Sequence, residues 1–330
     1  MTKPAPIPEG IEFGKLTTFQ GLSVLPVYQT SPQEAIEYLT LDEALTNAQV
    51  HITELNEGGN VPELLLHNGA EKSVLLVDGE ELVGAKQNRT LNLTILAPAN
   101  KKTVIPVSCV EAGRWAYTSD EFTHSNRAHF ARGRARKMAS VSESMASAGS
   151  RRSNQGEVWA DIDMKLSRME MASDTSAMAD MYKASETSLQ AYVDAFDTST
   201  NQVGAFFYLN QKLVGFDIFD KPETFSRLFG KLLRSYAIEA VEEAVTDETS
   251  PGTTKAESLL AALRTAAWRN YPATGLGDDY RFQSPRLTAA SLVVEEVVIH
   301  ASGFLIPEGQ SGRSDSGMAS LHRRRRLRMH

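Results

Sequence analysis

Short apolar runs separated by turn signals fill the first third of this chain and limit what it can fold into. Between residues 16 and 115 the runs are LSVLPVY, VHITEL, ELLLHN, SVLLV, LNLTIL and TVIPVSCV, separated by NEGG, NGAEK, DG and APANKK. Runs of this length bounded by Gly, Asn, Asp and Pro are typical of β-strands. Strands joined at such spacing favour a sandwich or a barrel, so we expect residues 16–115 to form a β-sandwich-like domain.

One short helix interrupts this pattern, and longer helices follow it. The segment TLDEALTN predicts a helix with Thr40 as N-cap and Glu43 completing a capping box. From Gln155 the apolar residues recur with a helical period, and a second helix is expected over 175–196. Ser153 and Thr175 are the expected caps of these two helices.

The last part of the chain alternates strands and helices. QVGAFFYLNQKLVGFDIF predicts two strands joined at Asn210 and Gln211, and the helix that follows has Pro222 in its first turn. A further helix at KAESLLAALRTAAW and a hairpin that turns near Glu295 and Glu296 complete an α+β domain over 155–305. The expected fold class is therefore α+β, with the β-sandwich-like domain first.

Three segments are expected to lie outside these domains. Residues 1–15 are expected to be a disordered arm, and residues 306–330, ending LHRRRRLRMH, a disordered basic tail. Residues 116–154 are rich in small residues and arginine, which predicts a basic connector or a long functional loop.

Composition excludes several classes of protein. The net charge of −7 argues against nucleic acid or a membrane surface as a general partner, and no apolar segment approaches the roughly 20 residues that cross a bilayer. The single Cys109 rules out an internal disulfide, and the N-terminus does not read as a secretory signal, so we expect a cytoplasmic protein. Cys109 follows an apolar strand and is expected to be buried. No Cys/His spacing indicates a metal, and no cofactor can be named.

The stretch VDGEELVGAKQNRT, residues 77–90, carries more charge than a turn between two buried strands requires. Alternation in LNLTIL directs Arg89 toward the apolar side, where a guanidinium needs a carboxylate or a ligand phosphate. Glu80 or Glu81 could be that partner. The stretch is therefore either a structural ion pair or a ligand pocket. The pocket hypothesis takes Asp78, Lys86, Gln87, Asn88 and Arg89 as ligand contacts, and Glu80 and Glu81 as acid or base.

Two other stretches could contribute to such a pocket. The connector arginines, among them Arg134 and Arg136, could bind phosphate, and they could equally form a solvated loop. SNQGEVW places Gln155 and Glu157 at a helix start, where Glu157 is either a partner of the helix dipole or a general base. Arg114, shortly after Cys109, is a further candidate ligand contact.

Three strings resemble a known family. DGEELVGAKQNR, IPVSCVEAGRW and SNQGEVW, in that order, resemble the ARG and rhodanese-phosphatase-associated protein family, over roughly Leu22 to Phe304. The family's name records an association with ADP-ribosylglycohydrolases, which implies a role in handling NAD- or ADP-ribose-derived molecules. The resemblance implies no particular reaction and no catalytic residues.

Two functions stay open on the sequence. In the first, the protein binds or hydrolyses an NAD- or ADP-ribose-derived molecule, with connector arginines and Arg89 on its phosphates. In the second, it binds a ligand or acts as a scaffold without turnover, because no catalytic triad, metal motif or activated cysteine is recognisable.

Overall fold

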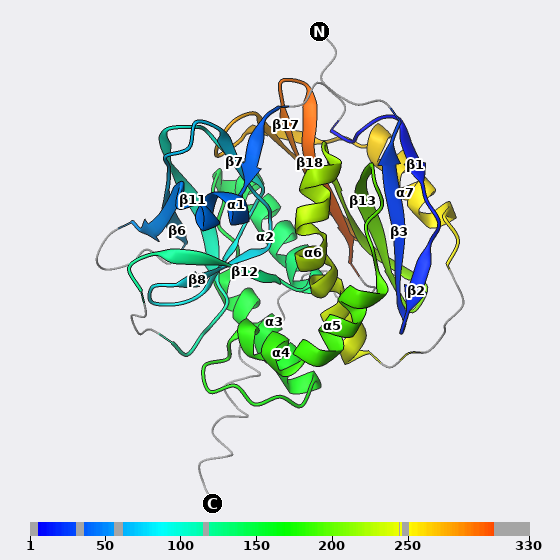
Figure 1. Ribbon diagram of the computed structural model, residues 1–330, viewed down its shortest axis with the longest axis horizontal. Helices are drawn as coiled ribbons and strands as arrows, with labels where there is room; N and C mark the ends of the chain where they lie inside the picture. The colour runs from blue at the N-terminus through cyan, green and yellow to red at the C-terminus, as the bar shows by residue number, and fades with distance from the viewer. Residues whose placement is uncertain are drawn as a thin grey trace, which may run out of the picture.

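The computed structural model describes residues 6–30, 36–55, 62–114, 119–243, 245 and 251–306, and combines helices with mostly antiparallel sheets (Figure 1). The largest sheet has nine strands in the order β1-β3-β13-β14-β18-β17-β16-β15, with β2 also paired to β3. Its strands are β1 (Ile11–Phe13), β2 (Thr17–Phe19), β3 (Leu22–Gln29), β13 (Gln202–Leu209), β14 (Lys212–Phe219), β15 (Arg269–Pro272), β16 (Asp278–Ser284), β17 (Leu287–Val294) and β18 (Val297–Leu305).

Two smaller sheets come from the first half of the chain. The six-stranded sheet has the antiparallel order β12-β8-β9-β11-β6-β5, and the three-stranded sheet has the order β10-β7-β4 with β4 parallel to β7. Their strands are β4 (Tyr38–Thr40), β5 (Val50–Glu54), β6 (Glu63–Asn68), β7 (Ser73–Leu76), β8 (Glu80–Gly84), β9 (Arg89–Leu91), β10 (Ile95–Ala97), β11 (Lys101–Cys109) and β12 (Phe122–Ala128).

Helices lie between and around the sheets. They are α1 (Leu41–Thr46), α2 (Ala131–Ala148), α3 (Gln155–Arg168), α4 (Met178–Ala184), α5 (Glu186–Ala195), α6 (Pro222–Glu242) and α7 (Thr254–Thr265). In Figure 1, α2 and α6 lie between the six-stranded sheet on the left and the nine-stranded sheet on the right. α2 contacts β16, β17 and β18, and α6 contacts both β13 and β12, so these two helices join the sheets.

The central strands of the nine-stranded sheet, β13, β14 and β18, are buried on both faces and carry apolar side chains on each side. On one face Phe207 packs against Tyr236 of α6 with ring centroids 3.8 Å apart. On the other face Phe206 and Phe216 stack at 4.9 Å in the core that includes Leu260 of α7. Neighbouring residues of a strand point to opposite faces, so Phe206 and Phe207 contribute to different cores.

Several local predictions are confirmed. Thr40 accepts from the main chain of Glu43, whose side chain accepts in return, and the helix begins at Leu41. Pro222 opens α6. Both two-residue turns are present with positive φ at both residues: 45° and 65° at Asn210 and Gln211, and 50° and 68° at Glu295 and Glu296.

The prediction that residues 116–154 form a connector or a loop was wrong at the centre of that segment. Residues Ala131–Ala148 form the helix α2, which packs between the sheets. Its buried positions recur at helical spacing, but two of them are Arg134 and Lys137, so a search for apolar periodicity misses the helix.

Other boundaries also differ. The expected disordered arm contains β1, which pairs with β3. The single helix expected over 175–196 is two helices, α4 and α5, with Ser185 between them, and Ala177 rather than Thr175 precedes α4. The N-cap of α3 is Asn154 rather than Ser153, because its carboxamide oxygen accepts from the N–H groups of Gly156 and Glu157.

The structure supports an α+β fold, whereas the expected sandwich is not confirmed. Strands from residues 16–115 are shared among three sheets, and β3 pairs with β13 across the expected domain boundary. The division into domains stays a prediction, and the tail from residue 307 lies outside the described residues.

Candidate functional site

Residues 77–91 are mostly buried on both faces of their strands, and only Val83 and Lys86 are half-buried. Glu80 and Glu81 are each 1% exposed and Arg89 is fully buried, as are Thr90 and Leu91. The burial of Arg89 was expected from the alternation, but the burial of the polar face was not. Helices α2 and α6 lie between the two larger sheets (Figure 1), and their Lys137 and Lys231 donate to Asp78 and Glu80 of this stretch.

Arg89 pairs with neither Glu80 nor Glu81. Its Nη2 donates to Glu54 Oε1 of β5 at 3.3 Å, and its Nη1 donates to the main-chain oxygen of Gln87 at 3.0 Å. In the antiparallel register Arg89 is opposite Leu82, and Thr90 is opposite Glu81. Paired residues share a face, so Arg89 and Glu81 point to opposite faces.

Glu80 pairs with α6 instead. Its Oε1 accepts from Lys231 Nζ at 2.7 Å, and its Oε2 accepts from the main-chain N–H of Val77 at 2.7 Å. Burial raises the pKa of Glu80, and Lys231 only partly offsets this. Lys231 also donates to Asp42 at 2.8 Å, so this lysine ties the hairpin to both α6 and α1.

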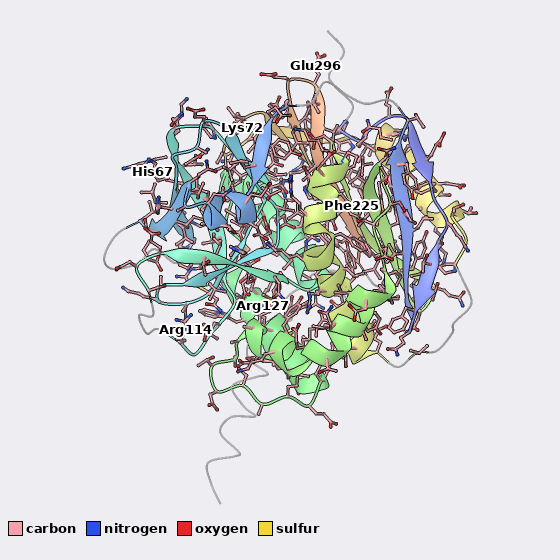
Figure 2. All side chains as sticks on the ribbon, in the orientation of Figure 1. His67, Lys72, Arg114, Arg127, Phe225 and Glu296 are labelled. Atoms are coloured by element: carbon pink, nitrogen blue, oxygen red, sulfur yellow. The ribbon has the colours of Figure 1, made fainter. Side chains whose placement is uncertain are left out.

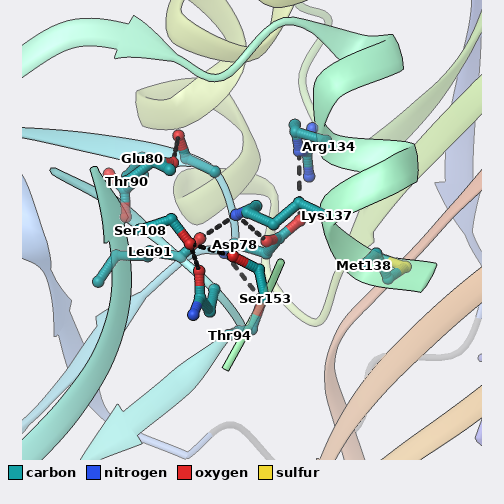
Figure 3. A network of polar contacts seen from close by, with 12 residues as sticks. Asp78, Glu80, Thr90, Leu91, Thr94, Ser108, Arg134, Lys137, Met138 and Ser153 are labelled. Carbon is teal, nitrogen blue, oxygen red and sulfur yellow. Dashed lines mark hydrogen bonds and ion pairs between the residues drawn. The ribbon is translucent and has the colours of Figure 1, made fainter. Parts of the chain in front are cut away.

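Asp78 lies in a larger network of buried charges (Figure 3). Lys137 Nζ donates to Asp78 Oδ1 at 2.7 Å, and Arg134 Nε donates to Asp78 Oδ2 at 3.4 Å. Arg134 also makes a two-pronged contact with Asp217 of β14, at 2.7 and 3.1 Å. Burial raises the pKa of Asp217, but Arg134 and His300 outweigh it, and the net pKa lies below the ordinary value.

A hydroxyl, an imidazole and a carboxylate follow one another at this network. Thr94 Oγ1 lies 2.8 Å from His300 Nδ1, and His300 Nε2 lies 3.2 Å from Asp217 Oδ1. The order resembles that of a nucleophile, its base and an orienting acid. The adjoining cavity, however, measures about 10 Å³, which is room for one water molecule and for no substrate.

A second group of polar residues runs from the buried Glu81 to two arginines at the surface. We call it the Arg127 edge, and its members are Glu81, Asn88, Glu111, Arg114, Ser125 and Arg127. Arg127 Nε donates to Glu81 Oε2 at 2.5 Å, and Ser125 donates to the same oxygen at 3.0 Å. Burial raises the pKa of Glu81, against Arg127, Ser125 and Asn88, which lower it. Glu81 Oε1 is buried and has no hydrogen-bond partner within the described residues.

Arg114 forms the other end of the Arg127 edge. Its Nε donates to Glu111 at 2.7 Å, and its Nη2 donates to Asn88 at 2.9 Å. The side chains of Arg114 and Arg127 are 18% and 22% exposed, so both reach the surface. Figure 2 shows both on the lower left, where β8 and β12 approach α3 and α4.

The other sequence candidates do not converge on the Arg127 edge. Gln155 holds the start of α3 to the main chain of Cys109 through two bonds of 2.8 Å, and Arg136 pairs with Asp161. Glu157 is exposed in the first turn of α3 and accepts from Asn154 at 3.0 Å. Lys86 is half-buried, and Gln87 lies beside Arg89.

Cys109 is fully buried, as expected, and burial raises the pKa of its thiol to about 11. Two surface hollows, of about 530 and 430 Å³, lie beside α7 and away from the charged stretch. Within the described ranges no group of three or more His, Cys, Asp or Glu side chains is arranged to hold a metal ion. None of the described helices combines the length and the apolar character needed to cross a membrane.

Sequence reasoning did not select Arg127, Ser125, Glu111 or Lys231 as site residues. In the sequence Arg127 is one of several arginines of the segment 116–154, and nothing local distinguishes it from the others. Pairing of β12 with β8 brings it to Glu81, and only the register of that pairing, which is shifted between His124 and Ala128, determines this.

The fold and the buried charges define the class of this protein: it combines helices with mostly antiparallel sheets, and buried ion pairs join the sheets. The chain belongs to the family of the ARG and Rhodanese-Phosphatase-superfamily-associated Protein domain, whose family model matches residues 10–304. Comparison with curated proteins and with solved structures gave no match.

Proposed function

We propose that the protein binds a small phosphate-containing ligand of the NAD or ADP-ribose type at the Arg127 edge. One observation carries the proposal. Arg127 is held through Nε by Glu81, while its Nη1 and Nη2 donate to no acceptor in the part of the chain that the structure describes. A guanidinium fixed on one side and open on the other is suited to two-pronged contact with a phosphate.

Three further features support this assignment. Arg114 adds a second cation near the surface, and its position is fixed by Glu111 and Asn88. Ordered donors lose less conformational entropy on binding than mobile surface arginines do. The family name associates the domain with ARG proteins, which favours an ADP-ribose-type ligand over other phosphates.

Deeply buried arginines are poorer candidates than Arg127. Arg134 is fully buried and its donors face Asp217 and Asp78, and Arg89 is fully buried against Glu54. A phosphate could reach them only by replacing a buried carboxylate, which leaves that carboxylate without a partner.

Calorimetric titration with ADP-ribose, AMP, NAD and pyrophosphate tests the proposal. Arg127→Lys keeps the charge beside Glu81 but loses the fork, so we expect the affinity to fall by about tenfold or more with little change in thermal stability. Arg152→Lys is the matched control, because the side chain of Arg152 is 59% exposed and lies outside the Arg127 edge. A wild-type protein that binds none of the four compounds contradicts the proposal.

Hydrolysis of the bound ligand is a second candidate, favoured by Glu81. Its raised pKa and its unpartnered Oε1 suit a carboxyl group that exchanges a proton with a bound ligand. Under this candidate Glu81→Gln abolishes product formation from NAD or ADP-ribose, followed by chromatography with and without Mg²⁺, and retains binding. If the wild type binds the ligand and forms no product, hydrolysis is contradicted and the protein is one that binds its ligand without turnover.

A further inference from the structure

The edge of the nine-stranded sheet at β1 has main-chain groups that pair with no other strand among the residues that the structure describes. Gly10 O accepts from Thr30 N, and Gly14 N donates to Pro26 O, so residues 10, 12 and 14 are directed at β3. In an antiparallel ladder the residues between them point the other way. The N–H and C=O groups of Ile11 and Phe13 therefore face outward, and β1 is an end of the strand order.

A groove of about 530 Å³ runs along this edge beside α7, the yellow helix next to β1 and β3 in Figure 1. Its lining residues are Ile11, Glu12, Phe13, Thr253, Glu257, Leu260 and Arg264. The residues contributed by α7 and its N-cap follow one another at intervals of four, three and four, so they form one stripe of the helix that faces the strand edge.

The groove has an apolar floor, and two acidic residues lie near it. Leu260 is 3% exposed and Phe13 packs edge-on against Phe206 at 5.6 Å, so the floor is part of the core beneath α7. Glu12 and Glu257 are exposed. Arg264, at the far end, donates to Pro8 O at 3.2 Å and offsets part of this negative charge.

We propose that this groove binds an extended peptide of a partner protein, in which apolar residues alternate with lysine or arginine. The peptide adds a strand to β1 through the outward groups of Ile11 and Phe13. Side chains of a strand alternate between its faces, so the apolar side chains of the peptide lie with Phe13 on the α7 face, and its cations lie with the exposed Glu12 on the other face. An edge strand beside a helix is a recurrent arrangement for this mode of recognition, in which main-chain bonds supply affinity and side-chain pockets supply specificity.

The test uses fluorescence anisotropy of the full chain with a fluorescein-labelled octapeptide, KVKVKVKV. A control peptide of the same sequence, N-methylated at all eight residues, keeps the charges and side chains but has no N–H donors. We expect saturable binding of the first peptide and none of the second. Equal binding of both would mean attraction by charge alone and would overturn the proposal.

Protein variants locate the contact. Glu12→Lys reverses a charge on the face that the cations take, and Ile11→Pro removes an N–H that β3 does not use. Each should weaken binding by about tenfold or more, equivalent to 1.4 kcal/mol. Glu223→Lys makes the same charge change at an exposed position of α6 and should leave affinity unchanged. A loss of affinity in Glu223→Lys as large as in Glu12→Lys overturns the proposal.

Sedimentation distinguishes the partner peptide from a second copy of this chain. A wild-type dimer that Glu12→Lys converts to monomer would place another copy at this edge and would overturn the proposal. The Arg127 variants leave this groove unchanged, so loss of nucleotide binding and loss of peptide binding can be observed separately.

Discussion

Glu239 of α6 accepts a hydrogen bond from the main-chain N–H of Arg132 at 3.0 Å, and so caps α2 from another helix. The N-cap residue of α2 is Phe130, which has no side-chain acceptor. Helix starts leave N–H groups without partners inside the helix, and burial makes an unpaired one costly. Glu239 also accepts from the buried Lys165 at 2.9 Å, so one carboxylate serves a helix end and an ammonium group.

Replacing Glu239 should therefore destabilise the fold in a graded way. Glu239→Ala removes the cap and one partner of Lys165, and we expect the free energy of unfolding in urea to fall by about 3–5 kcal/mol. Glu239→Gln keeps an acceptor for Arg132 N–H and should cost clearly less. Glu143→Ala, at an exposed position of α2, is the control. Equal losses for Gln and Ala would contradict the capping role.

Arg134→Met should be among the most damaging single substitutions. It leaves Asp217, and in part Asp78, without a cation in the interior, at a cost of about 3–5 kcal/mol. Adding Asp217→Asn should recover part of this loss, because no carboxylate then remains at that position. Urea unfolding at pH 7 measures the stability of the single and of the double variant. A double variant less stable than Arg134→Met would contradict the prediction.

Asp220 should make stability fall as pH rises. It is bonded to Tyr38, and burial raises its pKa from 3.8 to about 6. The folded pKa exceeds the unfolded one, so the contribution of this group is fully present below pH 3.8 and is lost as pH rises through 6. Asp220→Asn should remove this dependence. The stability of the variant relative to wild type should therefore rise between pH 5 and pH 7.5.

The gain in the free energy of unfolding can be at most roughly 3 kcal/mol, because the pKa of Asp220 is shifted by about 2 units. Unfolding in urea at the two pH values measures it, and Asp197→Asn, at an exposed residue, serves as the control. A variant whose stability relative to wild type is the same at both pH values would show that Asp220 is not the group responsible.

Gln211→Gly should stabilise the protein. Gln211 has a φ of 65° in a two-residue turn that favours Asn-Gly, and Asn210 already occupies the first position. Glycine adopts this conformation without steric strain, and we expect a gain of about 0.5–1 kcal/mol in thermal unfolding. Lys212→Gly, one residue further in a strand, should instead lower stability. A loss at both positions would contradict the strain at Gln211.

Local chemistry could be predicted from the sequence where it depends on neighbours in the chain. The capping box of Thr40 and Glu43, the proline that opens α6 and the turn at Asn210 each involve residues no more than four positions apart. The partners of charged residues could not be predicted in this way. Arg89 pairs with Glu54, and Arg134 pairs with Asp217, across separations of 35 and 83 residues. The sequence around each arginine does not indicate which distant carboxylate it pairs with.

The helix α2 shows why a hydrophobic pattern alone was insufficient. Ala131, Met138, Val141 and Met145 occupy its buried face, but Arg134 and Lys137 share that face. A pattern that counts only apolar residues is broken at those two positions, and the abundant serine and glycine then suggest a loop. The partners that make burial of these cations tolerable come from β14 and from the turn before β8.

The pairing of β3 with β13 has a consequence during synthesis of the chain. Leu22 lies opposite Leu209, so β3 leaves the ribosome more than 170 residues before its neighbour exists. The cations of α2 likewise emerge before Asp217 does. The nascent chain must therefore carry an apolar strand without its neighbour, and Arg134 without Asp217, until its second half is translated, and a chain that stops short of β13 cannot complete this sheet.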